Sequence, residues 1–212
     1  MNLDLIKKVI VVTGGSKGIG AGIVEVLSQE GALPVIVGRD RKQINQVISA
    51  YSKKGVQVGH AFAELTDPFQ CEQAVKKIIE DFGTIHGLVN NAGVNDGVGL
   101  ENGTNADFIQ SITKNVVHYY TMAQLVLPEL KKNKGAIVNI GSKIATTGQG
   151  GTSGYAAANG GRDALTKEWA VELLPYAIRV NSVIVAECYT PLYEKWIKTF
   201  ENPEEKLKAI TD

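Results

Sequence analysis

The segment 151–165, GTSGYAAANGGRDAL, carries two polar side chains at helical spacing. Tyr155 and Asn159 are four residues apart, and residues i and i+4 lie one above the other on an α-helix. A tyrosine hydroxyl can pass a proton to or from a substrate oxygen, but because it titrates near about pH 10 it needs a nearby cation to act as a base at neutral pH. Asn159 can donate a hydrogen bond but carries no charge. The segment therefore places two polar side chains on one face of a predicted helix.

A second chemical signal follows the first apolar run of the chain. The stretch TGGSKGIG, residues 13–20, has glycines at 14, 18 and 20, where the backbone can turn tightly and approach a ligand closely. A helix that starts in this stretch would point its free N–H groups at an anion such as pyrophosphate. The position of the loop between the first strand and the first helix favours a nucleotide site over a plain strand-to-helix turn.

Short β-branched runs alternate with longer segments of helical period along the whole chain. Nearly continuous apolar character is typical of strands buried on both faces, and a strand, helix, strand order predicts a parallel sheet with right-handed crossovers. In the helix 18–29, residues Ile19, Ile23, Val26 and Leu27 are predicted to share one face. We predict an α/β fold, a doubly wound parallel β-sheet of Rossmann type with helices on both faces, forming one dinucleotide-binding domain over 1–212. The predicted strands are 8–12, 33–37, 56–63, 87–90, 136–140 and 179–185.

Composition excludes several classes of function. The chain has 212 residues and a net charge of zero, so it has no general attraction for nucleic acid. The apolar run after the first lysine pair is too short for a signal peptide or a membrane span, and we expect a soluble, cytoplasmic protein that does not bind a membrane. Two distant cysteines predict no disulfide framework, and the three histidines lack metal-ligand spacing, so we expect no metal site.

Four motifs in order resemble the short-chain dehydrogenase/reductase family over essentially the whole chain. TGGSKGIG fits the family's TGxxxGxG cofactor loop and NNAG at 90–93 its fourth-strand motif. Ser142 and Tyr155, thirteen residues apart, match its serine and tyrosine, and Asn115 matches its helical asparagine. More narrowly, NNAGVNDGVGL, GQGGTSGYAAA and AECYTPLY resemble sugar dehydrogenases of the L-fucose dehydrogenase type.

The resemblance implies hydride transfer between a nicotinamide and an alcohol or carbonyl. It implies that Ser142 holds the substrate oxygen, that Tyr155 transfers the proton and that Asn115 helps to hold a water. The family has a lysine at position 159, and its loss would lower the population of the tyrosine base about a hundredfold to a thousandfold, most severely for alcohol oxidation. An engineered substitution, a natural pseudo-enzyme and a site that compensates in another way would each explain Asn159. A non-catalytic NAD(P)-binding module or subunit of an assembly is the alternative function. A methyltransferase of similar topology would not explain the Ser142, Tyr155 and Asn115 set.

Cofactor choice depends on the residues after the second predicted strand. Glycine followed by Arg39, with Lys17 in the glycine loop, gives a positive rim suited to the 2′-phosphate of NADP. Asp40 is the counterargument, because its carboxylate could accept the ribose hydroxyls of NAD. We expect NADP, with NAD possible. By resemblance, the expected cofactor contacts are Gly14, Ser16, Lys17, Gly18, Ile19, Gly20, Arg39, Glu64, Leu65, Asn91, Ala92, Gly93, Tyr155, Asn159, Cys188 and Thr190.

The substrate segment departs most from the family. Val185 and Ala186 stand where the family often has proline and glycine, which makes the bend around the nicotinamide less rigid. Asn95 and the following aspartate could bind a polyol or simply form a turn, and both interpretations stay open. We expect a substrate-binding segment over about 186–212, a homo-oligomer (dimer or tetramer), and a last helix and seventh strand missing from this chain, either because it is a fragment or because one sheet edge is exposed. Candidate substrate contacts are Asn95, Gln149, Glu187 and Trp196, whereas Trp169 is expected in the core.

Overall fold

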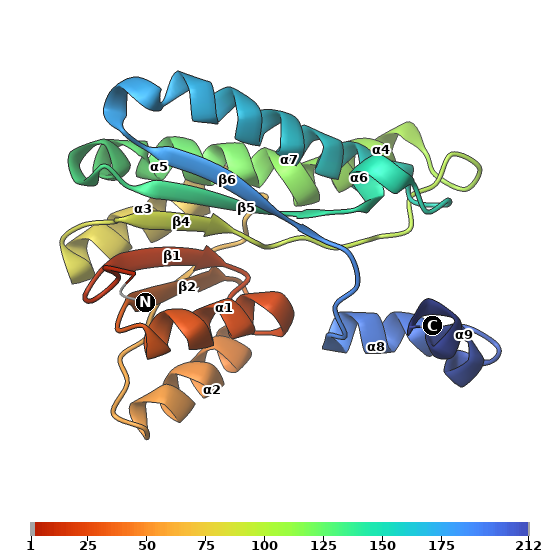
Figure 1. Ribbon diagram of the computed structural model, residues 1–212, viewed down its shortest axis with the longest axis horizontal. Coiled ribbons are helices and arrows are strands. Elements are labelled where there is room, and N and C mark those ends of the chain that lie inside the picture. The colour runs from red at the N-terminus through yellow and green to blue at the C-terminus, as the bar shows by residue number, and fades with distance from the viewer. Residues whose placement is uncertain (1–2, 212) are drawn as a thin grey trace.

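A six-stranded parallel sheet forms the centre of the computed structural model, which describes residues 3–211 (Figure 1). The strand order is β3-β2-β1-β4-β5-β6, so the chain runs outward from β1 in one direction and from β4 in the other. The predicted doubly wound fold is therefore confirmed, and its switch point lies between β1 and β4, where ligands bind in such sheets. The strands are β1 (Val9–Thr13), β2 (Leu33–Gly38), β3 (Gly59–Phe62), β4 (Gly87–Asn90), β5 (Ala136–Ser142) and β6 (Arg179–Val185).

Two hydrophobic cores lie on opposite faces of the sheet. Helices α1 (Gly18–Gln29) and α2 (Arg41–Ser52) cover one face, and α3 (Pro68–Phe82), α5 (His118–Asn133) and α7 (Ser153–Glu172) cover the other (Figure 1). Successive residues of β1 alternate between the two cores, as a strand with helices on both sides requires. Trp169 is 6% exposed and lies in the core beneath α3, α5 and α7, which confirms its predicted place.

The remaining elements connect these layers and extend past the sheet. Helix α4 (Asn105–Ile112) begins with a capping box between Thr104 and Asp107, and it continues through a π-helical turn, η1 (Thr113–Val117), into α5. The short α6 (Ile144–Thr147) precedes α7, and a 3-10 turn, η2 (Leu174–Tyr176), precedes β6. Figure 1 shows α8 (Pro191–Ile197) and α9 (Pro203–Thr211) set apart from the sheet, beyond the end of β6. No helix in the described part of the chain could span a membrane.

The structure corrects details of the sequence prediction. The third strand is limited to Gly59–Phe62 rather than 56–63, and β1 lies one residue later than predicted, while β5 continues to Ser142 because its last residues pair with β6. Val26 does not pack against the core as Ile19, Ile23 and Leu27 do, since its side chain is 55% exposed. Val24 is fully buried instead, and a residue two positions further along a helix points about 200° away.

Candidate active site

The glycine turn after β1 is shaped to receive a phosphate group. Gly14 and Gly18 have φ values of +66° and +56°, which side-chain-bearing residues rarely adopt. A Cβ on Gly20 would clash with the Gly14 carbonyl oxygen and lie 2.6 Å from Asn91 Nδ2. Helix α1 starts here without a side-chain cap from Lys17, so its first N–H groups remain directed at the turn, which includes Ser16 and Ile19. The turn therefore fits a dinucleotide pyrophosphate.

Thr13 fastens the end of β1 to the loop after β4. Its Oγ1 accepts hydrogen bonds from the backbone N–H groups of Asn91 (2.9 Å) and Ala92 (3.1 Å). Asn91 returns one, donating from Nδ2 to the Thr13 carbonyl at 2.9 Å. Gly93 follows, where a Cβ would lie 2.6 Å from Nη2 of Arg162. These contacts bring the glycine turn and the NNAG motif together, with the Asn91 amide engaged in holding them.

The ends of β2 and β3 carry an exposed ion pair. Arg39 Nη1 lies 2.7 Å from Glu64 Oε2, and the Arg39 side chain is 79% exposed. Burial acts to raise the pKa of Glu64, but the hydrogen bonds from Arg39 and Thr66 outweigh it and the pKa is lowered. Asp40 caps α2 by accepting from the Gln43 N–H at 3.0 Å, and Leu65 is half-buried beside Glu64.

The segment after β6 returns to the glycine turn. Thr190 begins α8, its Oγ1 accepting from the Tyr193 N–H at 3.2 Å, and a Cβ on Gly18 would lie 3.5 Å from Thr190 Cβ. Cys188 is exposed two residues earlier. The structure thus brings Thr190 beside the predicted phosphate site.

Ser142 and Tyr155 lie at the same edge of the sheet. Ser142 is the last residue of β5, and its Oγ accepts from the Ile144 N–H at 3.4 Å. Tyr155 is the third residue of α7 and is half-buried. Asn159 has no exposed surface: Nδ2 donates to the Tyr155 carbonyl at 2.9 Å and Oδ1 accepts from Arg162 Nη1 at 3.1 Å. The Asn159 amide is therefore directed inward, and its contact with a cofactor ribose stays a prediction.

Arg162 is the residue of this site that the sequence reasoning missed. It is 3% exposed, and its Nε donates to the Asn115 carbonyl at 2.6 Å while Nη1 donates to the Ile140 carbonyl at 3.1 Å. Its spacing is the signal that could have found it, because an arginine seven residues after Tyr155 lies on the same helix face as residues 155 and 159.

Asn115 sits in the π-helical turn and is fully buried. Its Oδ1 accepts from the Val94 N–H at 2.8 Å, and its Nδ2 donates to the Val94 carbonyl at 2.9 Å and the Ser111 carbonyl at 3.0 Å. The side chain thus holds the loop after the NNAG motif. A π turn disturbs the regular helix ladder, and the Asn115 carbonyl bonds Arg162 instead.

Two ionisable side chains of α5 lie beside Arg162. Its guanidinium carbon is 4.3 Å from the ring centroid of Tyr119, whose hydroxyl donates to the Ile140 carbonyl at 3.0 Å. Burial raises the pKa of Tyr119 well above its usual value. Burial, and then the charge of Arg162, lower the pKa of His118 to about 4. Both side chains are therefore neutral at neutral pH.

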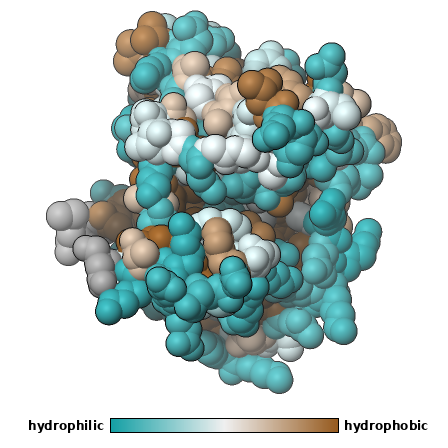
Figure 2. Space-filling model, turned by 90° about the vertical axis from the view of Figure 1, so that its right-hand side faces the viewer, coloured by the Kyte–Doolittle hydropathy of each residue, from teal (hydrophilic) through white to brown (hydrophobic). Residues whose placement is uncertain are grey.

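Figure 2 looks at the molecule from the side on which α8 and α9 lie, and hydrophilic residues cover much of this face. Asn95 Oδ1 accepts from Thr152 Oγ1 (2.7 Å) and the Gly97 N–H (3.3 Å), so it serves the turn interpretation. Gln149 is exposed beside a depression lined by residues 99–102, 150, 151 and 153.

The chain after β6 adds a charged pair and a row of aromatic rings. Glu187 pairs with Lys143, the residue after Ser142. Burial, and then Glu187, raise the pKa of Tyr193 to about 12. Trp196 is half-buried and packs edge-to-face against Tyr193 (5.1 Å between centroids) and Phe200 (5.0 Å).

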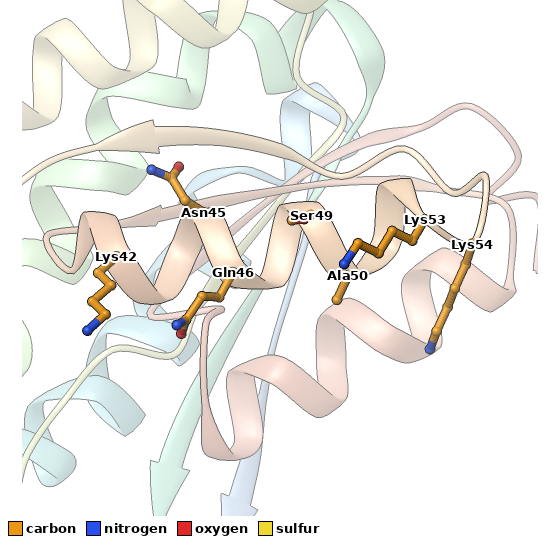
Figure 3. A pocket seen from close by; sticks show the side chains of 7 residues that line it. All are labelled: Lys42, Asn45, Gln46, Ser49, Ala50, Lys53 and Lys54. Carbon is orange, nitrogen blue, oxygen red and sulfur yellow. The ribbon is translucent and has the colours of Figure 1, made fainter.

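A shallow depression along the outer side of α2 is a different surface. Figure 3 shows its lysine, asparagine, glutamine and small side chains, which come from residues 42–54 and include none of the predicted site residues. It lies on the helix rather than at the carboxyl ends of the strands, so it has no part in the candidate site.

Fold and site together define a dinucleotide-binding α/β protein, and comparison with known proteins gives its family. The short chain dehydrogenase profile matches residues 8–200. Rat L-fucose dehydrogenase is 32% identical over 202 residues, covering 92% of this chain and 72% of its own. The Thermotoga maritima 3-oxoacyl-[acyl-carrier-protein] reductase FabG is 31% identical over 189 residues (89% and 77%). The crystal structure of Cj0485 dehydrogenase superposes with a TM-score of 0.91 at 41% identity, covering 99% of this chain and 80% of that one.

The chain therefore belongs to the short-chain dehydrogenase family. Membership implies an oxidoreductase and a nicotinamide cofactor, NAD or NADP.

Proposed function

We propose that this chain is an NAD(P)-dependent oxidoreductase that interconverts an alcohol and a carbonyl of a sugar or polyol, with L-fucose-like substrates. The observation that carries the proposal is the placement of the glycine turn, Ser142 and Tyr155 at one edge of a parallel sheet. The similarity to L-fucose dehydrogenases supports the sugar class. Exposed carboxylate and amide groups such as Glu187 and Gln149 supply the partners that sugar hydroxyls need.

The proposed chemistry uses few side chains. Ser142 holds the substrate oxygen, and Tyr155 accepts its proton in oxidation and donates a proton in reduction. The nicotinamide, when bound, supplies the hydride acceptor or donor. Because Asn159 provides no charge, we expect oxidation at neutral pH to be slower than a lysine at position 159 would allow, and to rise with pH.

A substrate panel tests this function. Sugars and polyols are oxidised with NADP or NAD from about pH 7 to about pH 10, and a 3-oxoacyl thioester is reduced in parallel. We expect turnover with an L-fucose-like sugar. Turnover of the thioester alone would replace the sugar proposal by the activity for which the FabG relative is named.

We infer NADP as the preferred cofactor, with NAD as the alternative. The exposed guanidinium of Arg39 at the end of β2, held by Glu64, is suited to a 2′-phosphate. Asp40 already accepts a hydrogen bond as the α2 cap, which weakens the case for it as a ribose ligand. The melting temperature should rise more with NADP than with NAD at equal concentration.

A non-catalytic NAD(P)-binding subunit remains the second candidate, and the inward-facing Asn159 amide favours it. In that case cofactor would raise the melting temperature while no substrate of the panel turned over, even at high pH.

We also propose a homo-oligomer. Exposed apolar side chains on α4, α5, η1 and α7 support this, including Ile109, Val117, Tyr120 and Val171, which are 44–69% exposed. Light scattering should give a dimer or tetramer mass, and a monomer would refute the proposal.

A further inference from the structure

Arg162 is a buried cation without a carboxylate partner. Its side chain is 3% exposed, and each of its hydrogen-bond acceptors is a neutral amide oxygen, from Asn115 (carbonyl and Oδ1), Ile140 and Asn159. Within residues 3–211 it forms no ion pair. A buried charge needs compensation, so a group able to become negative is expected nearby.

The groups around Arg162 can be surveyed element by element. His118 and Tyr119 of α5 are neutral at neutral pH. Asp163, the next residue of α7, has a buried Oδ1 that lies near Gly141 of β5, and among the described residues it forms no ion pair with Arg162. In the loop after β5, Lys143 is paired with Glu187, and in the loop after β4, Asp96 accepts from Ser111 and lies 3.8 Å from Lys114.

Among residues 3–211, Tyr155 of α7 also lies close to Arg162, and its hydroxyl can become negative. Its ring centroid lies 5.8 Å from the Arg162 guanidinium carbon, and residues 155, 159 and 162 follow one helix face. The guanidinium therefore lies over the Tyr155 ring, in the geometry of a cation–π contact.

We propose that Arg162 is a positioning residue that holds the positive charge of the site in place of a lysine at position 159 and thereby favours the ionised form of Tyr155. This inference rests on the proposed oxidoreductase function. In alcohol oxidation the hydroxyl proton moves to the Tyr155 oxygen and the hydride moves to the nicotinamide, so the guanidinium gains and loses nothing. Because arginine does not release a proton in proteins, Arg162 supplies charge but cannot relay protons.

Three features hold the guanidinium in place. The π-helical turn presents the Asn115 carbonyl to Nε, β5 presents the Ile140 carbonyl to Nη1, and Gly93 leaves the space that a Cβ would take from Nη2. Asn159 Oδ1 also accepts a hydrogen bond from Nη1. A lysine at position 159 would bring a second cation to the same place, so Asn159 and Arg162 are expected to work as a pair.

The test compares Arg162→Gln, which removes the charge and keeps amide donors, with Arg162→Lys, which keeps the charge. The first readout is the pH profile of sugar oxidation. The second uses cofactor-free protein: the ultraviolet difference absorbance of tyrosinate is followed against pH, and the Tyr155→Phe protein is subtracted. Arg179→Leu, which removes an exposed arginine at the opposite end of the sheet, is the matched control.

Arg162→Gln should lower oxidation at neutral pH about tenfold to a hundredfold, and its profile and its Tyr155-dependent tyrosinate signal should both move to higher pH. Arg162→Lys should retain part of the effect, and Asn159→Lys combined with Arg162→Leu should restore oxidation at neutral pH. The control should change neither readout.

The proposal would be overturned if Arg162→Gln lowered the rate of sugar oxidation equally at every pH and left the pH of the tyrosinate transition unchanged. Arg162 would then have a structural role only. If Arg162→Gln fails to fold, an Arg162→Lys protein with an unshifted pH profile supports the proposal. An Arg162→Lys profile shifted as far as that of the charge-free single variant Arg162→Leu overturns it. A protein that oxidises no sugar refutes the proposed function alone, because the tyrosinate titration still decides the role of Arg162.

Discussion

The glycine turn and the polar face of α7 lie at the same edge of the sheet, but they follow the family pattern to different degrees. The turn keeps its glycines, and its ligand-binding groups are backbone N–H groups fixed by the start of α1. The α7 face has an uncharged Asn159 four residues after Tyr155 and a buried arginine, Arg162, seven residues after it. The glycine turn works through its backbone, so it depends on glycine at particular positions. The α7 face needs a positive charge, and in our proposal an arginine elsewhere on the same helix face supplies it.

The largest effect should come from filling the glycine turn. Gly20→Val places side-chain atoms against the Gly14 carbonyl and the Asn91 amide, so the shift of melting temperature by NADP and all turnover should disappear. Gly22→Ala is the matched control on the same helix, because nothing lies within 4 Å of its Cβ, and it should stabilise the protein by up to about 1 kcal/mol. A Gly20→Val protein that binds cofactor normally would contradict the phosphate site.

Tyr155→Phe affects the α7 side alone. Turnover should fall about a hundredfold or more, because the proton acceptor is removed. The cofactor-induced shift of the melting temperature should be retained, since the glycine turn is untouched. Undiminished sugar oxidation by this variant would show that another group transfers the proton.

The buried His118 of α5, which lies beside Arg162, should make the free energy of unfolding depend on pH. Its pKa is lowered from 6.5 to about 4, so the unfolded chain binds the proton first, and stability present above about pH 6.5 is lost as the pH falls toward 4. At about pH 5 the loss should be about 2 kcal/mol. Urea unfolding at neutral and acid pH measures it, and His118→Phe should flatten the dependence. If the free energy of unfolding of that variant still fell with pH as in the unchanged protein, other groups would cause the acid sensitivity.

Arg39→Ala should have the smallest effect and sharpen the cofactor side of the comparison. The preference for NADP over NAD, measured as the ratio of dissociation constants, should fall about tenfold. Arg41→Ala is the control, because its guanidinium lies over the Phe62 ring at 4.2 Å. If Arg39→Ala left the ratio of the NADP and NAD dissociation constants unchanged, Arg39 would not contact the cofactor.

The backbone was more predictable than the side-chain partners. The predicted limits of 87–90 and 179–185 match β4 and β6, since turn residues and apolar runs define them locally. The end of β5 depends on pairing of Gly141 and Ser142 with β6, which a local pattern does not contain.

The uncharged residue at position 159 could be read from the sequence, but the burial of Arg162 beside it could not. The burial of Arg162 depends on the π-helical turn and on packing of α7 against α5 and β5, which are formed by residues distant along the chain.

The two tryptophans lie in separate environments, so their intrinsic fluorescence can be assigned to different parts of the protein. Trp169 is enclosed in the core beside Tyr120, whereas Trp196 stands in the aromatic row of α8. A Trp169→Phe protein would leave a single indole emitter on the helix that follows Thr190. Its fluorescence would then report the arrival of a ligand at that helix without any reaction taking place.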